Sequence, residues 1–146
     1  MSTKSRALRK RALNEYLLEG GFPELMNEEN KRGYIEALLN SIIKNDIAKR
    51  FKVRYVEVLR RLAEHLSDNF CQEFVASELA KTFGVSDHTI ENYYSYLKEA
   101  FLLQGIHKFS YKSKERIRCE KVYVVDVAFV SERENAFSTE NLGWRL

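Results

Sequence analysis

The sequence has little of what metal-binding, secreted or membrane proteins require. Its two cysteines, Cys71 and Cys119, lie far apart without CxxC spacing, and the three histidines complete no metal-ligand pattern with them. We therefore expect no metal site, and two isolated cysteines fit a reducing compartment. Because no stretch of about 18 apolar residues occurs either, we expect a soluble, cytoplasmic protein without a membrane partner.

Turn-forming residues are also scarce, since the 146 residues include one proline and six glycines. Three of them stand together, as Gly20, Gly21 and Pro23 in "YLLEGGFPEL". A glycine in the left-handed conformation ends many helices, and a proline just beyond it prevents the helix from continuing. The stretch predicts a helix C-cap followed by a rigid turn, with Gly20 or Gly21 left-handed.

What is present allows a folded core, because 45% of the residues are hydrophobic and 12% are aromatic. The length fits one ordinary domain or two very small ones. A formal net charge of +3 is too small to indicate a nucleic-acid partner by itself, so the position of the charges matters more.

Two amphipathic helices are predicted after the turn. Apolar residues at spacings of three and four predict a helix from Tyr34 to about Phe51, with Asn27 or Asn30 as its cap. A second helix has an apolar inner face formed by Val58, Leu59, Leu62, Ala63 and Leu66.

The stretch from Phe74 to Leu103 predicts a helix-turn-helix. Gly84 can adopt the positive φ of a tight turn, and Ser86 can accept hydrogen bonds from the first amides of the second helix. The apolar side of that helix is predicted to comprise Ile90, Tyr94, Leu97 and Phe101.

Two strand-like segments, "FLLQGIHKF" and "KVYVVDVAFV", follow around a polar stretch. They predict a β-hairpin, which turns the helix-turn-helix into a winged helix. The expected fold is therefore mainly α, in the α+β class, with a winged helix-turn-helix and a small β-hairpin.

Charge is distributed unevenly over this winged helix. Residues 67–105 contain six acids and two bases, a net charge of minus four, and the second helix begins with Asp87, His88 and Glu91. Carboxylates there are repelled by phosphates. The hairpin, residues 107–121, has six bases and two acids, a net charge of plus four. The candidates for nucleic-acid contact are Lys108, Lys112, Lys114, Arg116 and Arg118; the alternative is a solvated or protein-facing hairpin.

The chain resembles a family of bacterial and archaeal AAA-type (P-loop) ATPases, in the portion that follows the nucleotide-binding core. The resemblance is carried by "YLLEGGFPEL", "NDIAKRF", the helix-turn-helix, "FSYKSK", "KVYVVD" and "ENLGWRL", in that order. Such proteins continue through a winged helix into a C-terminal domain of unknown function that is similar to restriction endonucleases.

The resemblance implies roles for two groups of residues. Gly20, Gly21 and Pro23 match a turn in the helical lid that closes over the nucleotide. Asp46 and Arg50, spaced i and i+4, match a pair typical of the family, which can sense the nucleotide or form only a surface ion pair. Three parts are implied: a lid remnant at 1–53, a winged helix at 54–120 and the start of a nuclease-like domain at 121–146. ATP and magnesium are implied for the full-length parent, and no cofactor is expected in this chain.

Two motifs that catalysis would need are missing from these residues. No G-x-x-x-x-G-K-[ST] loop occurs, so the chain is not expected to hydrolyse ATP alone. Asp126 stands without the second carboxylate and lysine that metal-dependent phosphodiester cleavage requires.

The expected function is a non-catalytic segment of an AAA-type ATP-binding protein, whose partners are the missing ATPase core and C-terminal domain. One alternative is a free-standing winged-helix regulator that binds DNA through the basic hairpin. Another is an interaction module that forms homo-oligomers through apolar residues around Phe137 and Trp144.

Overall fold

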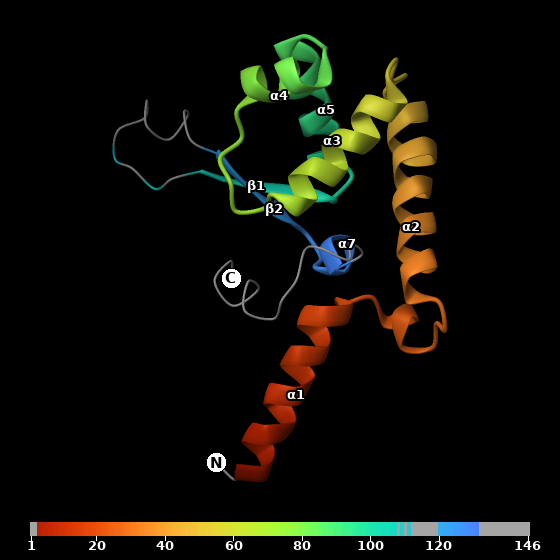
Figure 1. Ribbon diagram of the computed structural model, residues 1–146, viewed down its shortest axis with the longest axis vertical. Coiled ribbons are helices and arrows are strands. Elements are labelled where there is room, and N and C mark those ends of the chain that lie inside the picture. The colour runs from red at the N-terminus through yellow and green to blue at the C-terminus, as the bar shows by residue number, and fades with distance from the viewer. Residues whose placement is uncertain (1–2, 108, 110, 112–119, 132–146) are drawn as a thin grey trace. The chain divides into compact units, whose positions relative to one another are not determined.

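The computed structural model describes residues 3–107, 109, 111 and 120–131. This part of the chain is mainly helical and carries a small two-stranded antiparallel sheet (Figure 1), so the predicted α+β class is confirmed. Its contacts divide it into two units, one formed by the described residues up to Leu38 and from Asp126 onward, the other by Leu39–Val125. The predicted boundaries after residues 53 and 120 stay a prediction.

The first unit contains α1 (Thr3–Glu19), the 3-10 helix η1 (Pro23–Met26), the start of α2 and the short helix α7 (Ala128–Ser131). No side chain of α1 is buried, and even Leu8 and Leu13 are more than half exposed. The phenyl rings of Phe22 and Phe129 meet edge to face at 5.5 Å between centroids. Ring contact therefore joins the turn after α1 to α7.

The helix predicted to begin near Tyr34 is formed by α2 (Lys31–Ser41) and the π-helix η2 (Ile42–Ala48). Of the two predicted caps, Asn30 is the one used, because its Oδ1 accepts a hydrogen bond from the Gly33 amide at 3.0 Å. Ile43 and Ile47 are each 1% exposed, so the predicted apolar stripe is confirmed in this segment.

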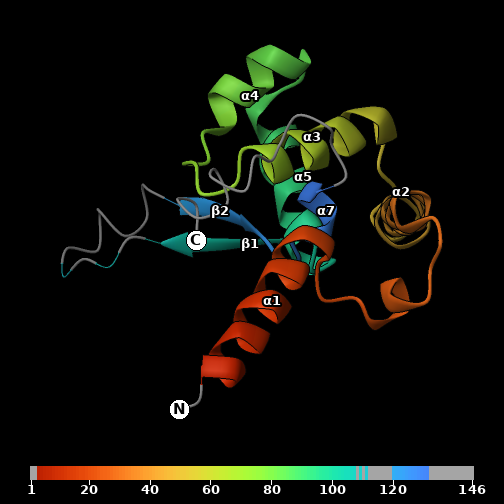
Figure 2. The same cartoon turned by 60° about the horizontal axis from the view of Figure 1, so that its bottom comes forward.

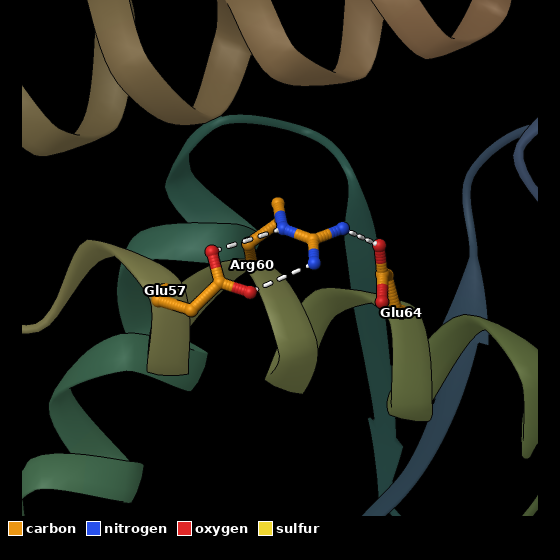
Figure 3. A network of polar contacts seen from close by, with 3 residues as sticks. All are labelled: Glu57, Arg60 and Glu64. Carbon is orange, nitrogen blue, oxygen red and sulfur yellow. Dashed lines mark hydrogen bonds and ion pairs between the residues drawn. The ribbon is translucent and has the colours of Figure 1, made fainter.

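The second unit packs α3 (Val56–Asp68), α4 (Ala76–Phe83) and α5 (Asp87–Glu99) beside the hairpin (Figures 1 and 2). The inner face predicted for α3 is confirmed at four of its five positions, Leu59, Leu62, Ala63 and Leu66, which are buried. On α3, the half-buried Arg60 bridges Glu57 and Glu64 (Figure 3). The hydrogen bond from Arg60 lowers the pKa of Glu57.

The helix-turn-helix has its predicted parts. Gly84 adopts a left-handed φ of 68° at the end of α4. The Ser86 hydroxyl accepts a hydrogen bond from the Thr89 amide at 3.2 Å and so caps α5. Ile90 and Leu97 are fully buried.

The hairpin is also confirmed: β1 (Leu103–His107) pairs antiparallel with β2 (Glu120–Val124), with Leu103 opposite Val124. The segment before α4 adds a further pairing that the sequence pattern did not reveal. Here Cys71 donates its amide hydrogen to the Val122 carbonyl at 2.7 Å, and Phe74 donates to the Glu120 carbonyl at 2.8 Å.

Two predictions near the hairpin are wrong. Phe101 does not continue the apolar side of α5, because the helix ends at Glu99 and Phe101 lies in a turn with φ of 55° and 79% exposure. The second strand ends at Val124 rather than running on through the apolar residues, since the chain turns at Asp126 and enters α7. A short apolar run cannot by itself distinguish a strand from a buried helical turn.

Candidate functional site

The turn after α1 has the predicted glycine geometry. Gly20 ends the helix with φ of 87°, and its amide donates to the Tyr16 carbonyl at 2.8 Å. Pro23 begins the 3-10 helix at a position where its missing amide hydrogen costs no hydrogen bond. The C-cap interpretation of "EGGFPE" is therefore confirmed.

Both glycines lie against the turn that precedes α7, within the first unit. A Cβ atom on Gly20 would overlap the Asp126 carboxylate and lie 2.5 Å from the Ala128 Cβ. The Gly21 amide donates to the Asp126 carboxylate, at 3.2 Å to Oδ1 and 3.0 Å to Oδ2. The close backbone approach that glycine permits is thus made to Asp126 and Ala128. The proximity of this turn to a nucleotide stays a prediction.

The Asp126 carboxylate accepts hydrogen bonds from backbone amides and belongs to no carboxylate cluster in the described part of the chain. Its Oδ1 also accepts a hydrogen bond from the Ala128 amide at 2.8 Å, which caps α7. Among the described residues, no three His, Cys, Asp or Glu side chains gather in a way that could hold a metal ion. Sequence reasoning identified the turn at Gly20 and Gly21 but placed Asp126 within a strand, so it missed the turn at Asp126 and the contact between the two.

Asp46 and Arg50 lie on the helix that continues from α2, and both are exposed. The Arg50 guanidinium lies 3.6 Å from the Glu99 carboxylate of α5, measured from Nη2 to Oε2. It also lies 5.0 Å from the centroid of the Phe51 ring. Asp46 belongs to the π-helical stretch, a geometry that occurs often at functional sites. Their role in nucleotide sensing stays a prediction.

The first turn of α5 is acidic at its surface, as its sequence indicated. Asp87, His88 and Glu91 are all exposed. A helix that reads bases usually presents Arg, Lys, Asn or Gln instead. These side chains therefore give α5 no cationic surface for phosphates at this end.

The basic residues predicted to contact nucleic acid, Lys108, Lys112, Lys114, Arg116 and Arg118, lie outside the described residues. The described parts of this region place two aromatic rings at the surface, because Phe109 is 80% and Tyr111 is 93% exposed. Their ring centroids are 5.3 Å apart in an edge-to-face contact. Exposed aromatic rings among lysine and arginine residues are a feature of sites that bind single-stranded nucleic acid.

A polar cluster that sequence reasoning missed lies where α5 crosses the hairpin. The Lys98 ammonium lies 2.9 Å from Oε1 of Glu120 and 4.3 Å from the centroid of the Tyr94 ring. The Glu120 carboxylate occupies the space that a Cβ on Gly105 would fill. Burial, and next the charge of Glu120, raise the pKa of Tyr94. An isolated glycine within a predicted strand was the signal for this close approach.

None of the described helices is long and apolar enough to cross a membrane. No solved structure matches the chain. Two relatives are "Uncharacterized protein MJ1544" of Methanocaldococcus jannaschii and an "Uncharacterized protein" of Haemophilus influenzae. The first is 33% identical over 133 residues and 86% of this chain. The second is 30% identical over 121 residues and 77% of this chain.

The chain spans 30% of the length of each of these relatives. A family of sequences described as a domain of unknown function, DUF8612, matches residues 10–140. Because that match runs from within α1 through the winged helix and past α7, and so covers more than half of the chain, the chain belongs to the DUF8612 family.

Proposed function

We propose that this chain is the winged-helix linking segment of a larger AAA-type ATP-binding protein, without catalysis of its own. The observation that carries the proposal is the hydrogen-bonded pair of Gly21 and Asp126. It joins two of the motifs on which the family resemblance rests, one before and one after the winged helix. In sequence, the winged helix therefore lies between two segments that are hydrogen-bonded to each other.

Three further observations support a linking role. The residues contain no P-loop motif, and the described part has no carboxylate cluster for a metal ion. The chain also corresponds to 30% of the length of its relatives, which leaves room for other domains in them. In the proposed role, ATP and magnesium are bound by the ATPase core of the full-length protein. The Gly20–Gly21 turn then reports the nucleotide state through Asp126.

The first test reads the coding sequence on both sides of this segment. An in-frame P-loop motif upstream and further coding sequence downstream are expected. Closely flanking stop codons in both directions would contradict the proposal.

The second test measures ATP hydrolysis by the full-length protein. Replacing Asp126 by Ala removes the acceptor for the Gly21 amide and is expected to change the rate or the KM for ATP by about threefold or more. The matched control is Asp87→Ala, which removes an exposed carboxylate on α5. If both variants hydrolyse ATP with the same rate and KM as the unaltered protein, Asp126 does not couple the turn to the nucleotide state.

The exposed pair Phe109 and Tyr111 favours a second candidate function, binding of nucleic acid by the hairpin. Fluorescence anisotropy with random-sequence duplex and single strand tests it. Micromolar affinity that falls steeply with salt is expected, together with its loss when Lys112, Lys114, Arg116 and Arg118 are changed to Ala. Absence of binding at low salt rejects this function. Dimerisation through Phe137 and Trp144 concerns residues outside the described part, and light scattering tests it.

A further inference from the structure

A groove of about 730 Å³ opens in the second unit, between residues 51–55 before α3 and the turn and first half of α5. Its walls come from residues 51–55 and 83–86, from Val58 of α3, and from four residues of α5: Thr89, Asn92, Tyr93 and Tyr96. Small-molecule sites have volumes of about 300–1,000 Å³. The groove therefore has the size of a site for a ligand as large as a nucleotide.

The lining of the groove is cationic. It includes Lys52 and Arg54 and no acidic side chain, although the chain has 21 acids and Asp87 and Glu91 are close in sequence. Neither cation has a carboxylate partner among the described residues. Lys52 also has φ of 50°, in the left-handed region. A non-glycine residue there is strained, and such strain is often found at ligand-binding sites. An anion in the groove would find unpaired positive charges.

Hydroxyl groups add hydrogen-bond donors to the same walls. Tyr93 is 5% exposed, and its hydroxyl oxygen accepts the Tyr55 amide hydrogen at 3.0 Å. The hydrogen of that hydroxyl has no acceptor within the described part of the chain, so it can be donated to a ligand. The Ser86 and Thr89 hydroxyl oxygens are 2.9 Å apart, an arrangement that uses only one of their two hydrogens. Free donors favour an acceptor-rich ligand such as a phosphate.

Aromatic rings form the other part of the lining. Phe51 and Tyr96 stack with centroids 4.0 Å apart and an interplanar angle of 7°. Tyr55 is 43% exposed, and the Arg54 guanidinium lies 5.1 Å from its ring centroid. A planar ligand ring can stack on tyrosine, and arginine strengthens such contacts. The groove thus combines phosphate-binding groups with a surface for a ring.

We propose that this groove binds an organic phosphate that carries a planar ring, of the mononucleotide class. The phosphate contacts Lys52, Arg54 and the Tyr93 hydroxyl, and the ring lies against Tyr55. This site is separate from the ATPase core in the proposed function and does not depend on it, because the chain by itself holds all of these groups.

The test is a titration of the ¹⁵N-labelled 146-residue chain with adenosine 5′-monophosphate, followed by amide NMR shifts. Saturable shifts are expected at residues 52–55 and 86–93, with submillimolar affinity (Kd below ~1 mM). Adenosine alone and inorganic phosphate alone are expected to bind at least about tenfold more weakly, because each lacks half of the contacts.

Two sets of variants distinguish binding in the groove from nonspecific attraction of anions to the positively charged chain. The pair Lys52→Gln and Arg54→Gln should weaken binding about tenfold or more. The control pair Lys44→Gln and Lys81→Gln removes the same charge from exposed positions outside the groove and should leave the affinity unchanged. Tyr55→Leu removes the ring and should reduce the preference for the nucleotide over phosphate.

Three results would overturn the proposal. They are the absence of saturable shifts at the groove with 5 mM nucleotide, equal affinity for the nucleotide and phosphate, or equal weakening by the groove and control pairs. The spectrum of each variant without ligand shows whether it folds. None of these results bears on the linking function, which is measured with the full-length protein.

Discussion

The Gly21 amide donates to both carboxylate oxygens of Asp126, at 3.2 and 3.0 Å, although 105 residues separate the two positions. The same carboxylate accepts the Ala128 amide and so begins α7. A single side chain therefore fixes the turn after α1 and the start of the last described helix.

Replacing Gly20 by Ala should destabilise the first unit by about 2 kcal/mol or more. The added Cβ would overlap the Asp126 carboxylate and crowd Ala128, and φ of 87° is unfavourable for alanine. Thermal unfolding by circular dichroism and hydrogen exchange of the Gly21 amide measure the effect. Gly84→Ala is the matched control, because Gly84 also has a positive φ but no atom lies within 4 Å of its added Cβ. It should cost about 1 kcal/mol, and equal costs would contradict the contact.

Replacing Gly105 by Ala should separate Lys98 from Glu120. The new Cβ would occupy the place of the Glu120 carboxylate and lie 2.7 Å from the Tyr94 hydroxyl oxygen. We expect a loss of about 1–3 kcal/mol in the free energy of unfolding, measured in urea. Because the Lys98–Glu120 pair is already lost, adding Glu120→Gln to this variant should cost less than in the unaltered chain. Additive costs would show that the pair survives.

Stability should fall at alkaline pH because of Tyr94. Burial and the charge of Glu120 raise its pKa in the folded state above the value of about 10 for an unfolded chain. The folded state thus favours the neutral phenol, so this contribution is fully present below pH ~10 and is lost as the pH rises above it. Tyr94→Phe should flatten this decline in urea unfolding at rising pH.

The control for this pH dependence is Tyr111→Phe, because Tyr111 is 93% exposed. It should leave the alkaline decline unchanged. If the free energy of unfolding falls equally with rising pH in Tyr94→Phe and in the unaltered chain, the decline is caused by groups other than Tyr94.

Replacing Phe101 by Gly should stabilise the chain by about 0.5–1 kcal/mol. The ring is 79% exposed and the residue has φ of 55°, so glycine removes strain while little buried area is lost. Phe101→Leu retains the side-chain penalty and should give no gain. Both are measured by urea unfolding, and a destabilising glycine would mean that the ring contributes burial.

Local signals in the sequence determined much of the winged helix. Gly84 and Ser86 specified the turn and the cap of α5, because a positive φ and a side-chain acceptor are properties of a few residues. The β-branched and aromatic residues before and after the basic stretch specified the hairpin, and the double glycine with Pro23 specified the end of α1. Phe101 shows the limit, since its spacing fits the apolar face of α5 but the helix ends two residues earlier.

Only the tertiary structure decided which distant groups meet. Local sequence patterns could not pair Gly21 with Asp126, Glu120 with Gly105, or residues 51–55 with the start of α5, because such contacts depend on how whole elements pack. Periodicity and capping are local properties of a few neighbouring residues. A carboxylate seated over a glycine, and a groove lined by cations from one segment and hydroxyls from another, arise when the chain brings separate segments within a few ångströms of each other.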